Sequence, residues 1–271
     1  MFGPGDLTVI IGERINPTGR AALADELRAG RFDKALSDAA AQAEAGADYI
    51  DVNVGAPGVD ETALLPQVVK AVAEETGLPV CVDSADPAAL AAALAVYRAP
   101  EAIVNSVTAD NESMDAVLPL VGETGCYVIA MTKDLGGIPA TAEERLTRAE
   151  RIVERASTFG IPPERILVDC LTIPAATESD AAAVTLRSIS LIREKLGCPV
   201  ALGASNISFG MPERPVINSA FLCLAIEAGL AAAIVNPLEP GLVLSIRAAD
   251  FLLAKDRMGR AYLKYYRAHK P

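Results

Sequence analysis

Short apolar runs alternate along the chain with longer segments rich in Ala, Leu, Glu and Arg. Near-continuous apolar runs of this kind are typical of parallel β-strands that are buried on both faces. We therefore predict eight strands. They lie at residues 7–11, 49–53, 80–83, 102–105, 126–131, 166–169, 200–203 and 232–235.

The intervening segments carry helix signals at their ends. Asp86 stands as an N-cap before Pro87, and Thr141 with Glu144 forms a capping box. Glycines at 46, 77, 197 and 229 follow the ends of four other segments, as helix C-caps often do. Helices are predicted at 32–45, 62–75, 87–97, 141–159, 180–196, 215–228 and 242–254.

Strands that alternate with helices predict a parallel sheet, which can close into a barrel or stay open and doubly wound. Eight repeats in 271 residues, without a Gly-rich dinucleotide-binding fingerprint, favour the closed (β/α)8 TIM barrel. No linker or low-complexity tract interrupts the pattern. We expect a single domain over residues 1–271.

Charge and composition narrow the function classes. A formal net charge of −11 and an aromatic content of 4% without Trp argue against a nucleic-acid partner. Apolar runs stay well short of the ~20 residues that span a bilayer, so no membrane segment is expected. Five singly placed cysteines are typical of a reducing compartment, and we expect a cytoplasmic protein.

Polar side chains end seven of the eight predicted strands, where a TIM barrel places its active site. Each residue taken alone can be explained as a helix cap or a turn former, but the complete set is harder to explain in that way. The set contains Glu13, Asn16, Asp51, Asn53, Asp83, Asn105, Asp169, Ser205, Asn206 and Asn236.

This set is rich in hydrogen-bond acceptors and poor in bases. The one histidine, His269, is expected to be exposed near the C-terminus, which argues against Ser-His-Asp or Cys-His catalysis. Zinc ligation has no support, and a magnesium site at Asp51 and Asp83 stays open without being required, so we predict no metal. A carboxylate that accepts two parallel N–H donors suits a pterin ring.

Motifs shared with a known family occur along the chain. They are residues 12–19 (GERINPTG), 45–55 (AGADYIDVNVG), 83–84 (DS), 104–106 (VNS), Asp169, 205–208 (SNIS) and 213–218 (ERPVIN). These stretches resemble methyltetrahydrofolate:corrinoid-protein methyltransferases, and the resemblance extends from Gly12 to Pro237 and includes the folate domain of cobalamin-dependent methionine synthase. It implies a dihydropteroate-synthase-like barrel.

The resemblance also implies roles for single residues. Asp83, Asn105 and Asp169 match positions that hold the pterin ring, and Asn206 matches the residue that reaches N5. We therefore expect Asn206, Asp83 and Asp169 to be catalytic. Substrate-binding residues are expected to include these together with Ser205, Asn105, Asp51, Asn53, Glu13 and Asn16. Phe209 departs from the family, which often has Gln there, so the polar contacts at that position differ.

The implied reaction moves a methyl group between N5 of tetrahydrofolate and the cobalt of a corrinoid. The chain lacks an Asp-x-His-x-x-Gly cobalamin motif, so the cobalamin is expected on a separate corrinoid-binding protein that docks over the barrel mouth. Residues 133–139 are predicted to form either a lid or an ordinary surface loop. The family implies a homodimer, and the sequence leaves the direction of transfer open.

Two alternatives remain. A dihydropteroate synthase would need basic residues for a pterin diphosphate. Its Asn-x-Thr-Pro-Asp-Ser-Phe pattern is replaced here by residues 16–20 (NPTGR), and residues 236–239 (NPLE) stand where its Ser-x-Arg/Lys end belongs. The second alternative, a non-catalytic folate-binding subunit, is kept open by Phe209.

Overall fold

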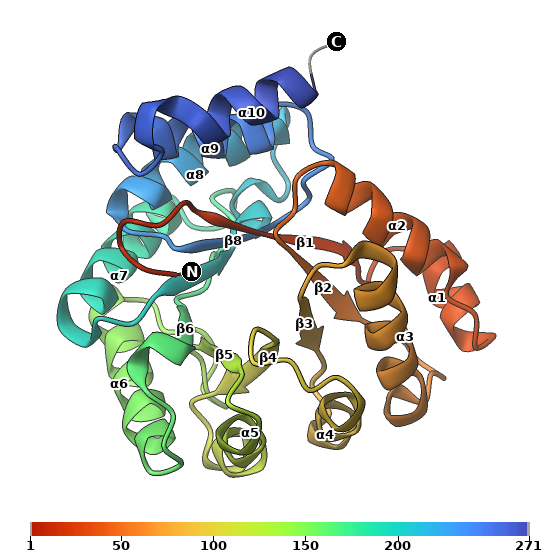
Figure 1. The fold of residues 1–271 in the computed structure, drawn as a ribbon. Helices are drawn as coiled ribbons and strands as arrows, with labels where there is room; N and C mark the ends of the chain where they lie inside the picture. Colours follow the sequence, from red (N-terminus) through yellow and green to blue (C-terminus); the bar gives the residue numbers. More distant parts are fainter. Residues whose placement is uncertain (1, 270–271) are drawn as a thin grey trace.

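In a computed structural model that describes residues 2–269, eight parallel strands form one closed barrel in the order β1 to β8 (Figure 1). The predicted (β/α)8 barrel is thereby confirmed. The strands are β1 (Val9–Ile15), β2 (Tyr49–Asn53), β3 (Val80–Asp83), β4 (Ile103–Thr108), β5 (Tyr127–Met131), β6 (Ile166–Asp169), β7 (Val200–Gly203) and β8 (Ala232–Val235).

Helices surround the strands on the outside (Figure 1). They are α1 (Ala21–Arg28), α2 (Asp33–Glu44), α3 (Glu61–Thr76), α4 (Pro87–Val96), α5 (Asn111–Thr124), α6 (Ala142–Ser157), α7 (Ala181–Leu196), α8 (Arg214–Ala228), α9 (Leu242–Leu252) and α10 (Arg260–Ala268). Short 3-10 turns are η1 (Pro163–Arg165), η2 (Ala204–Ser208) and η3 (Arg257–Gly259).

The helix caps predicted from the sequence are present in the structure. The Asp86 carboxylate accepts the Ala88 N–H, and Thr141 and Glu144 form the reciprocal capping box. Gly77 closes α3 in the left-handed conformation, at φ 65°, which costs glycine little.

Two strand ends and three helices differ from the prediction. Strand β1 continues beyond the predicted end at residue 11 to Ile15, and β4 continues past Asn105 through a bulge to Thr108. The backbone of polar residues at a barrel mouth can still pair with a neighbouring strand. A strand end predicted from the first polar residue therefore comes too early in the sequence. Helices α1, α5 and α10 were not predicted.

Alternation along the strands determines what the barrel encloses, because successive side chains point to opposite faces. One set of residues packs outward against the helices and forms the main core. The other set fills the barrel interior with apolar residues, among them Ile11, Cys81, Ile103 and Leu167. Two positions further along three of these strands stand Asp83, Asn105 and Asp169, so polar groups lie directly above an apolar plug.

A buried charge network closes the opposite end of the barrel. Asp250 is fully buried, and its carboxylate accepts hydrogen bonds from the Thr8 N–H and from the Thr8 hydroxyl at 2.7 Å. Arg247 and Lys255 approach the same carboxylate at 3.5 and 3.9 Å. Arg247 also reaches Asp48 at 3.1 Å, so α9 is tied to the start of the barrel. In this fold, polar contacts at the N-terminal face serve stability.

We predict that Asp250→Asn lowers the free energy of unfolding by about 3 kcal/mol, because removal of one partner leaves buried cations uncompensated. Urea denaturation at pH 7 measures the change. Asp25→Asn, which breaks an exposed ion pair with Arg28, is the control and should cost less than about 1 kcal/mol. A similar small loss in both variants would contradict a structural role for Asp250.

Candidate functional site

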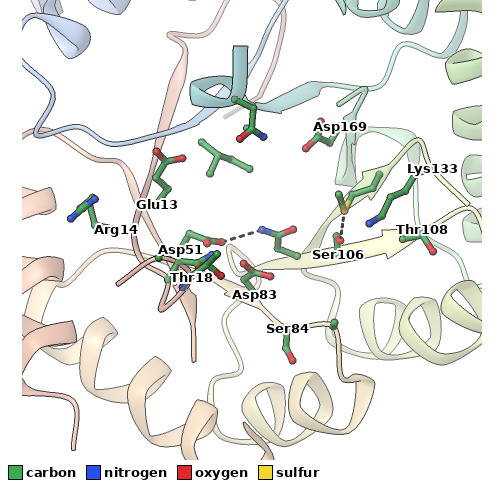
Figure 2. A pocket seen from close by; sticks show the side chains of 18 of the residues that line it. Glu13, Arg14, Thr18, Asp51, Asp83, Ser84, Ser106, Thr108, Lys133 and Asp169 are labelled. Atoms are coloured by element: carbon green, nitrogen blue, oxygen red, sulfur yellow. Dashed lines mark hydrogen bonds between the residues drawn. The ribbon is translucent and has the colours of Figure 1, made fainter. Parts of the chain in front are cut away.

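A cavity of about 920 Å³ opens at the carboxyl ends of the barrel strands. Figure 2 shows the carboxyl groups of Glu13, Asp51, Asp83 and Asp169 around this space. Seven residues predicted from the sequence line it. They are Glu13, Asn16, Asp51, Asp83, Asn105, Asp169 and Asn206.

Asp51 and Asp83 form a coupled carboxyl pair on neighbouring strands. Asp51 is buried, and both burial and the nearby Asp83 charge raise its pKa well above the ordinary value. Burial raises the pKa of Asp83 to about 6, although hydrogen bonds from Asn53 and Asp51 act to lower it. The Asn105 amide donates to Asp51 at 3.2 Å (Figure 2). A buried pair of this kind favours the state in which one carboxyl keeps its proton while the other ionises.

Asp169 ends β6 on another side of the cavity and is 7% exposed. Its carboxylate accepts the Leu171 N–H at 2.7 Å and a backbone N–H from Gly203. Burial nevertheless raises the pKa of Asp169 to about 6, against the opposing effect of Arg145 and Lys133. The carboxyl is therefore held in a fixed orientation and can change protonation state near neutral pH.

The turn η2 carries Asn206 directly after β7. The Ser205 hydroxyl donates to Glu13 at 2.9 Å, which ties this turn to β1. Arg214 holds its other side by donating to the Ser205 carbonyl and the Ser208 hydroxyl, both at 3.0 Å. A Cβ at Gly203 would meet the Asn206 amide nitrogen at 3.5 Å, an ordinary van der Waals distance, so the amide lies close to the end of β7.

Four predicted residues make local contacts. The Asn53 side chain accepts the Gly55 N–H at 2.8 Å beside the cavity and also supports Asp83. Ser205 acts through Glu13, as described above. Asn236 accepts the Leu238 N–H at 3.2 Å, a turn-making contact, while Asn16 combines a similar contact to Thr18 with a place in the cavity wall.

Several wall residues were not predicted. Lys133, at the start of the loop predicted to be either a lid or an ordinary surface loop, reaches the cavity beside Thr108 (Figure 2). Its position directly after β5 was the available signal. The tip of this loop is bent by a bridge between Asp134 and Gly137, and Leu135 is 96% exposed. The other residues missed in the wall include Arg14, Thr18, Arg20, Thr108, Ser113, Met131 and Ile234.

Phe209 stands on the surface rather than in the cavity wall. It is 64% exposed, and the Arg214 guanidinium lies 5.7 Å from the centre of its ring. The departure from Gln at this position therefore leaves the polar groups described above in place. His269 is exposed, as expected, and contacts the carbonyls of Glu44 and Tyr265.

The cavity offers paired acceptors, amides and carboxyls that titrate near neutrality. A flat heterocycle with N–H donors along one edge matches this set, because a carboxylate can accept two parallel donors. Within residues 2–269, no group of three or more His, Cys, Asp or Glu side chains is placed to hold a metal ion, and no helix is long and apolar enough to cross a membrane.

The raised pKa of Asp83 predicts a pH-dependent stability. The folded chain keeps this proton up to about pH 6, whereas the unfolded chain loses it near the ordinary value of 3.8. Stability contributed by the protonated group is complete below pH 3.8 and is lost as the pH rises through 6. The free energy of unfolding of Asp83→Asn should therefore exceed that of the wild type by about 1–3 kcal/mol at pH 8. The difference should shrink toward pH 4.

Urea denaturation at several pH values measures this difference, with Asp25→Asn as an exposed carboxyl control. A stability difference between Asp83→Asn and wild type that stays the same from pH 4 to pH 8 would contradict the raised pKa.

The sequence matches known proteins over most of its length. A family described as pterin binding enzymes matches residues 12–236. The methylcorrinoid:tetrahydrofolate methyltransferase of Eubacterium limosum is 35% identical over 268 residues, covering 97% of each protein. The methionine synthase of Mycobacterium tuberculosis is 34% identical over 248 residues, which cover 87% of this chain and 21% of that protein. The match thus spans about a fifth of that methionine synthase.

Solved structures show the same fold. Dihydropteroate synthase from Yersinia pestis, with a pterine-sulfa conjugate, superposes with a TM-score of 0.69 at 18% identity, covering 93% of this chain and 95% of that one. The enzyme from Clostridium difficile superposes with a TM-score of 0.71 at 21% identity, covering 93% and 99%. At these identities the likeness concerns the barrel alone, and it confirms the expected dihydropteroate-synthase-like architecture. With the match over residues 12–236, the chain belongs to the pterin-binding enzyme family.

Proposed function

We propose that this protein is a methyltransferase that moves a methyl group between a corrinoid, carried on a separate protein, and N5 of tetrahydrofolate. The observation that carries the proposal is the cavity itself, in which Asp83, Asn105 and Asp169 face one space at the barrel mouth. The 35% identity over nearly the whole chain to a methylcorrinoid:tetrahydrofolate methyltransferase supports the same reaction.

The donor set fits a reduced pterin. Asp169, fixed by two backbone N–H groups, can accept the 2-amino and ring N–H donors side by side. The Asn105 amide can meet the remaining donors and acceptors of the ring. The shared proton of Asp51 and Asp83 lets this wall of the cavity act as a donor or an acceptor.

Asn206 is placed to act on N5. When bound, the corrinoid supplies the cobalt that exchanges the methyl group with N5. When the methyl group leaves, N5 gains electron density, so a hydrogen bond donated by the Asn206 amide is stronger in the transition state than in the methyltetrahydrofolate ground state. Methylation of N5 passes through the same transition state. The carboxyl of Asp83, with a pKa of about 6, can receive the proton that N5 releases when it is methylated. The same group returns it in the reverse reaction.

We propose that transfer runs from the corrinoid to tetrahydrofolate, the direction in which the Eubacterium limosum relative is named. The partner's access is over the barrel mouth, where exposed apolar side chains surround the cavity. They come from the loop after β5, from the turn around η2 and from the loop after β8, and comprise Leu135, Ile138, Phe209, Met211 and Leu238.

Asn206→Ala tests the catalytic role. We expect methyl transfer between tetrahydrofolate and cobalamin, followed by the absorbance of cob(I)alamin, to slow about 10²- to 10³-fold. Tetrahydrofolate affinity, measured by calorimetry, should change less than about threefold, since the contact strengthens only in the transition state. Asp169→Asn is the matched variant and should weaken folate binding. An equal loss of rate and affinity in Asn206→Ala would contradict the assignment.

We also propose a cytoplasmic homodimer. The five cysteines are free thiols, which suits a reducing compartment. Val216, Ala220 and Leu224 are exposed at helical spacing along α8. Phe251 and Leu252 are exposed at the end of α9, the neighbouring helix (Figure 1). Apolar surface gathered in this way is typical of a face that a second copy covers.

Leu224→Arg should convert the dimer to a monomer in sedimentation experiments, because a charge on both sides of a two-fold contact repels itself. Val96→Arg, at an exposed apolar position on α4, is the control and should leave the mass unchanged. A wild-type chain that sediments as a monomer would contradict the dimer.

A further inference from the structure

Arg145 is a buried charge to which the mechanism above gives no role. It lies on α6 and is 1% exposed. Its Nε donates to the Pro139 carbonyl at 3.0 Å, and its Nη1 donates to the Cys170 and Leu171 carbonyls at 2.9 and 3.0 Å. The Thr185 hydroxyl lies 3.3 Å from the same nitrogen. All four acceptors are uncharged, so they satisfy the hydrogen bonds of the guanidinium without neutralising its positive charge. That charge can therefore act on ionisable groups nearby.

Three of the four acceptors belong to the loops after β5 and β6, and Thr185 lies on α7. Pro139 closes the loop after β5, and Cys170 and Leu171 follow β6 directly. Leu171 has a φ of 63°, a left-handed conformation that is costly for a residue with a Cβ. In this conformation its N–H points back to the Asp169 carboxylate at 2.7 Å. The carbonyls that Arg145 holds therefore fix the turn that orients the carboxylate.

Arg145 is also one of two cations that act on Asp169. From α6, Arg145 lowers the pKa of that carboxyl from behind the turn, and Lys133 lowers it from the loop after β5. Gly203 contributes a backbone N–H from β7, and the Cys170 thiol lies next along the chain. A guanidinium keeps its charge over the whole physiological range, so its effect is constant where the carboxyl titrates.

We propose that Arg145 is a positioning residue for Asp169, which holds the 170–171 turn and favours the ionised, fixed carboxylate that receives the pterin N–H groups. The ligand named here rests on the proposed function. The coupling between the guanidinium and the carboxyl is a property of the chain alone and can be measured without ligand.

Carbon-13 NMR of the aspartate carboxyls tests the coupling, with the Asp169 signal assigned by its loss in Asp169→Asn. The wild-type signal should titrate near pH 6. In Arg145→Met, which has similar bulk and no charge, the midpoint should rise by about one pH unit or more. Arg148→Met on the same helix, which breaks the 2.7 Å ion pair with Asp134, is the matched control and should leave the midpoint unchanged.

A folded Arg145→Met variant with the wild-type midpoint would overturn the proposal. Arg145→Lys provides a second test of the proposal if Arg145→Met does not fold. Lysine keeps the charge but lacks the planar guanidinium that hydrogen-bonds the carbonyls of the 170–171 turn. A rise in the Asp169 midpoint of less than about one pH unit supports the proposal, whereas an unchanged midpoint contradicts the role of Arg145 in holding that turn.

Tetrahydrofolate binding, measured from pH 5 to pH 8, separates this proposal from the proposed function. The acid limb of the binding profile should move with the NMR midpoint in Arg145→Met. If wild-type protein binds tetrahydrofolate and the midpoint does not move, the positioning role fails alone. If the midpoint moves and wild-type protein binds no tetrahydrofolate, the function fails and the positioning role stands.

Discussion

Four carboxyl groups share one cavity above an apolar barrel interior, those of Glu13, Asp51, Asp83 and Asp169. The free-energy cost of burying their charge is the main constraint on the contacts at the barrel mouth. Like charges this close cannot all ionise in a medium of low polarity. Asp51 and Asp83 meet the constraint with a shared proton and with amides from Asn53 and Asn105. Asp169 meets it with backbone N–H groups and two nearby cations.

Because their charges are stabilised in different ways, the carboxyls can take different roles in binding and proton transfer. A pair that shares a proton can give or receive one near neutral pH, whereas a carboxylate fixed by N–H groups presents acceptors in a constant direction. A pterin needs both properties, since its edge donates in parallel and its N5 changes protonation when the methyl group moves. Glu13 has a third use, because its bond to Ser205 places the turn that carries Asn206.

The sequence predicted the barrel and most of the cavity because both follow from local rules. Apolar runs of strand length and the caps at Asp86 and Thr141 are set by neighbouring residues. The mouth was harder to predict, since β1 and β4 continue through polar residues that pair with adjacent strands. Arg145 gave no signal, because it lies within a polar helical segment whose other arginines are exposed to a greater degree. Its burial depends on loops that meet only in the folded chain.

Asn53 and Ser205 have contacts within the site that the sequence does not reveal. Their types and places in the sequence predict direct contact with a ligand, and the structure adds a hydrogen bond from Asn53 to Asp83 and one from Ser205 to Glu13. Phe209 gives the converse case. A change from a polar to an aromatic residue beside Asn206 indicated an altered pocket, but the ring lies on the exposed rim over Arg214. Which face of a short turn a side chain takes is decided by its tertiary contacts.

Methyl transfer to N5, beyond the binding of a pterin, can be observed directly. The protein is incubated with tetrahydrofolate and ¹³C-methyl cobalamin, and the labelled carbon is followed by NMR. We expect the label to move from cobalt to N5 of the folate at a rate that depends on the protein. Label that stays on the cobalamin while the protein binds tetrahydrofolate would contradict it and would identify a folate-binding subunit without this activity.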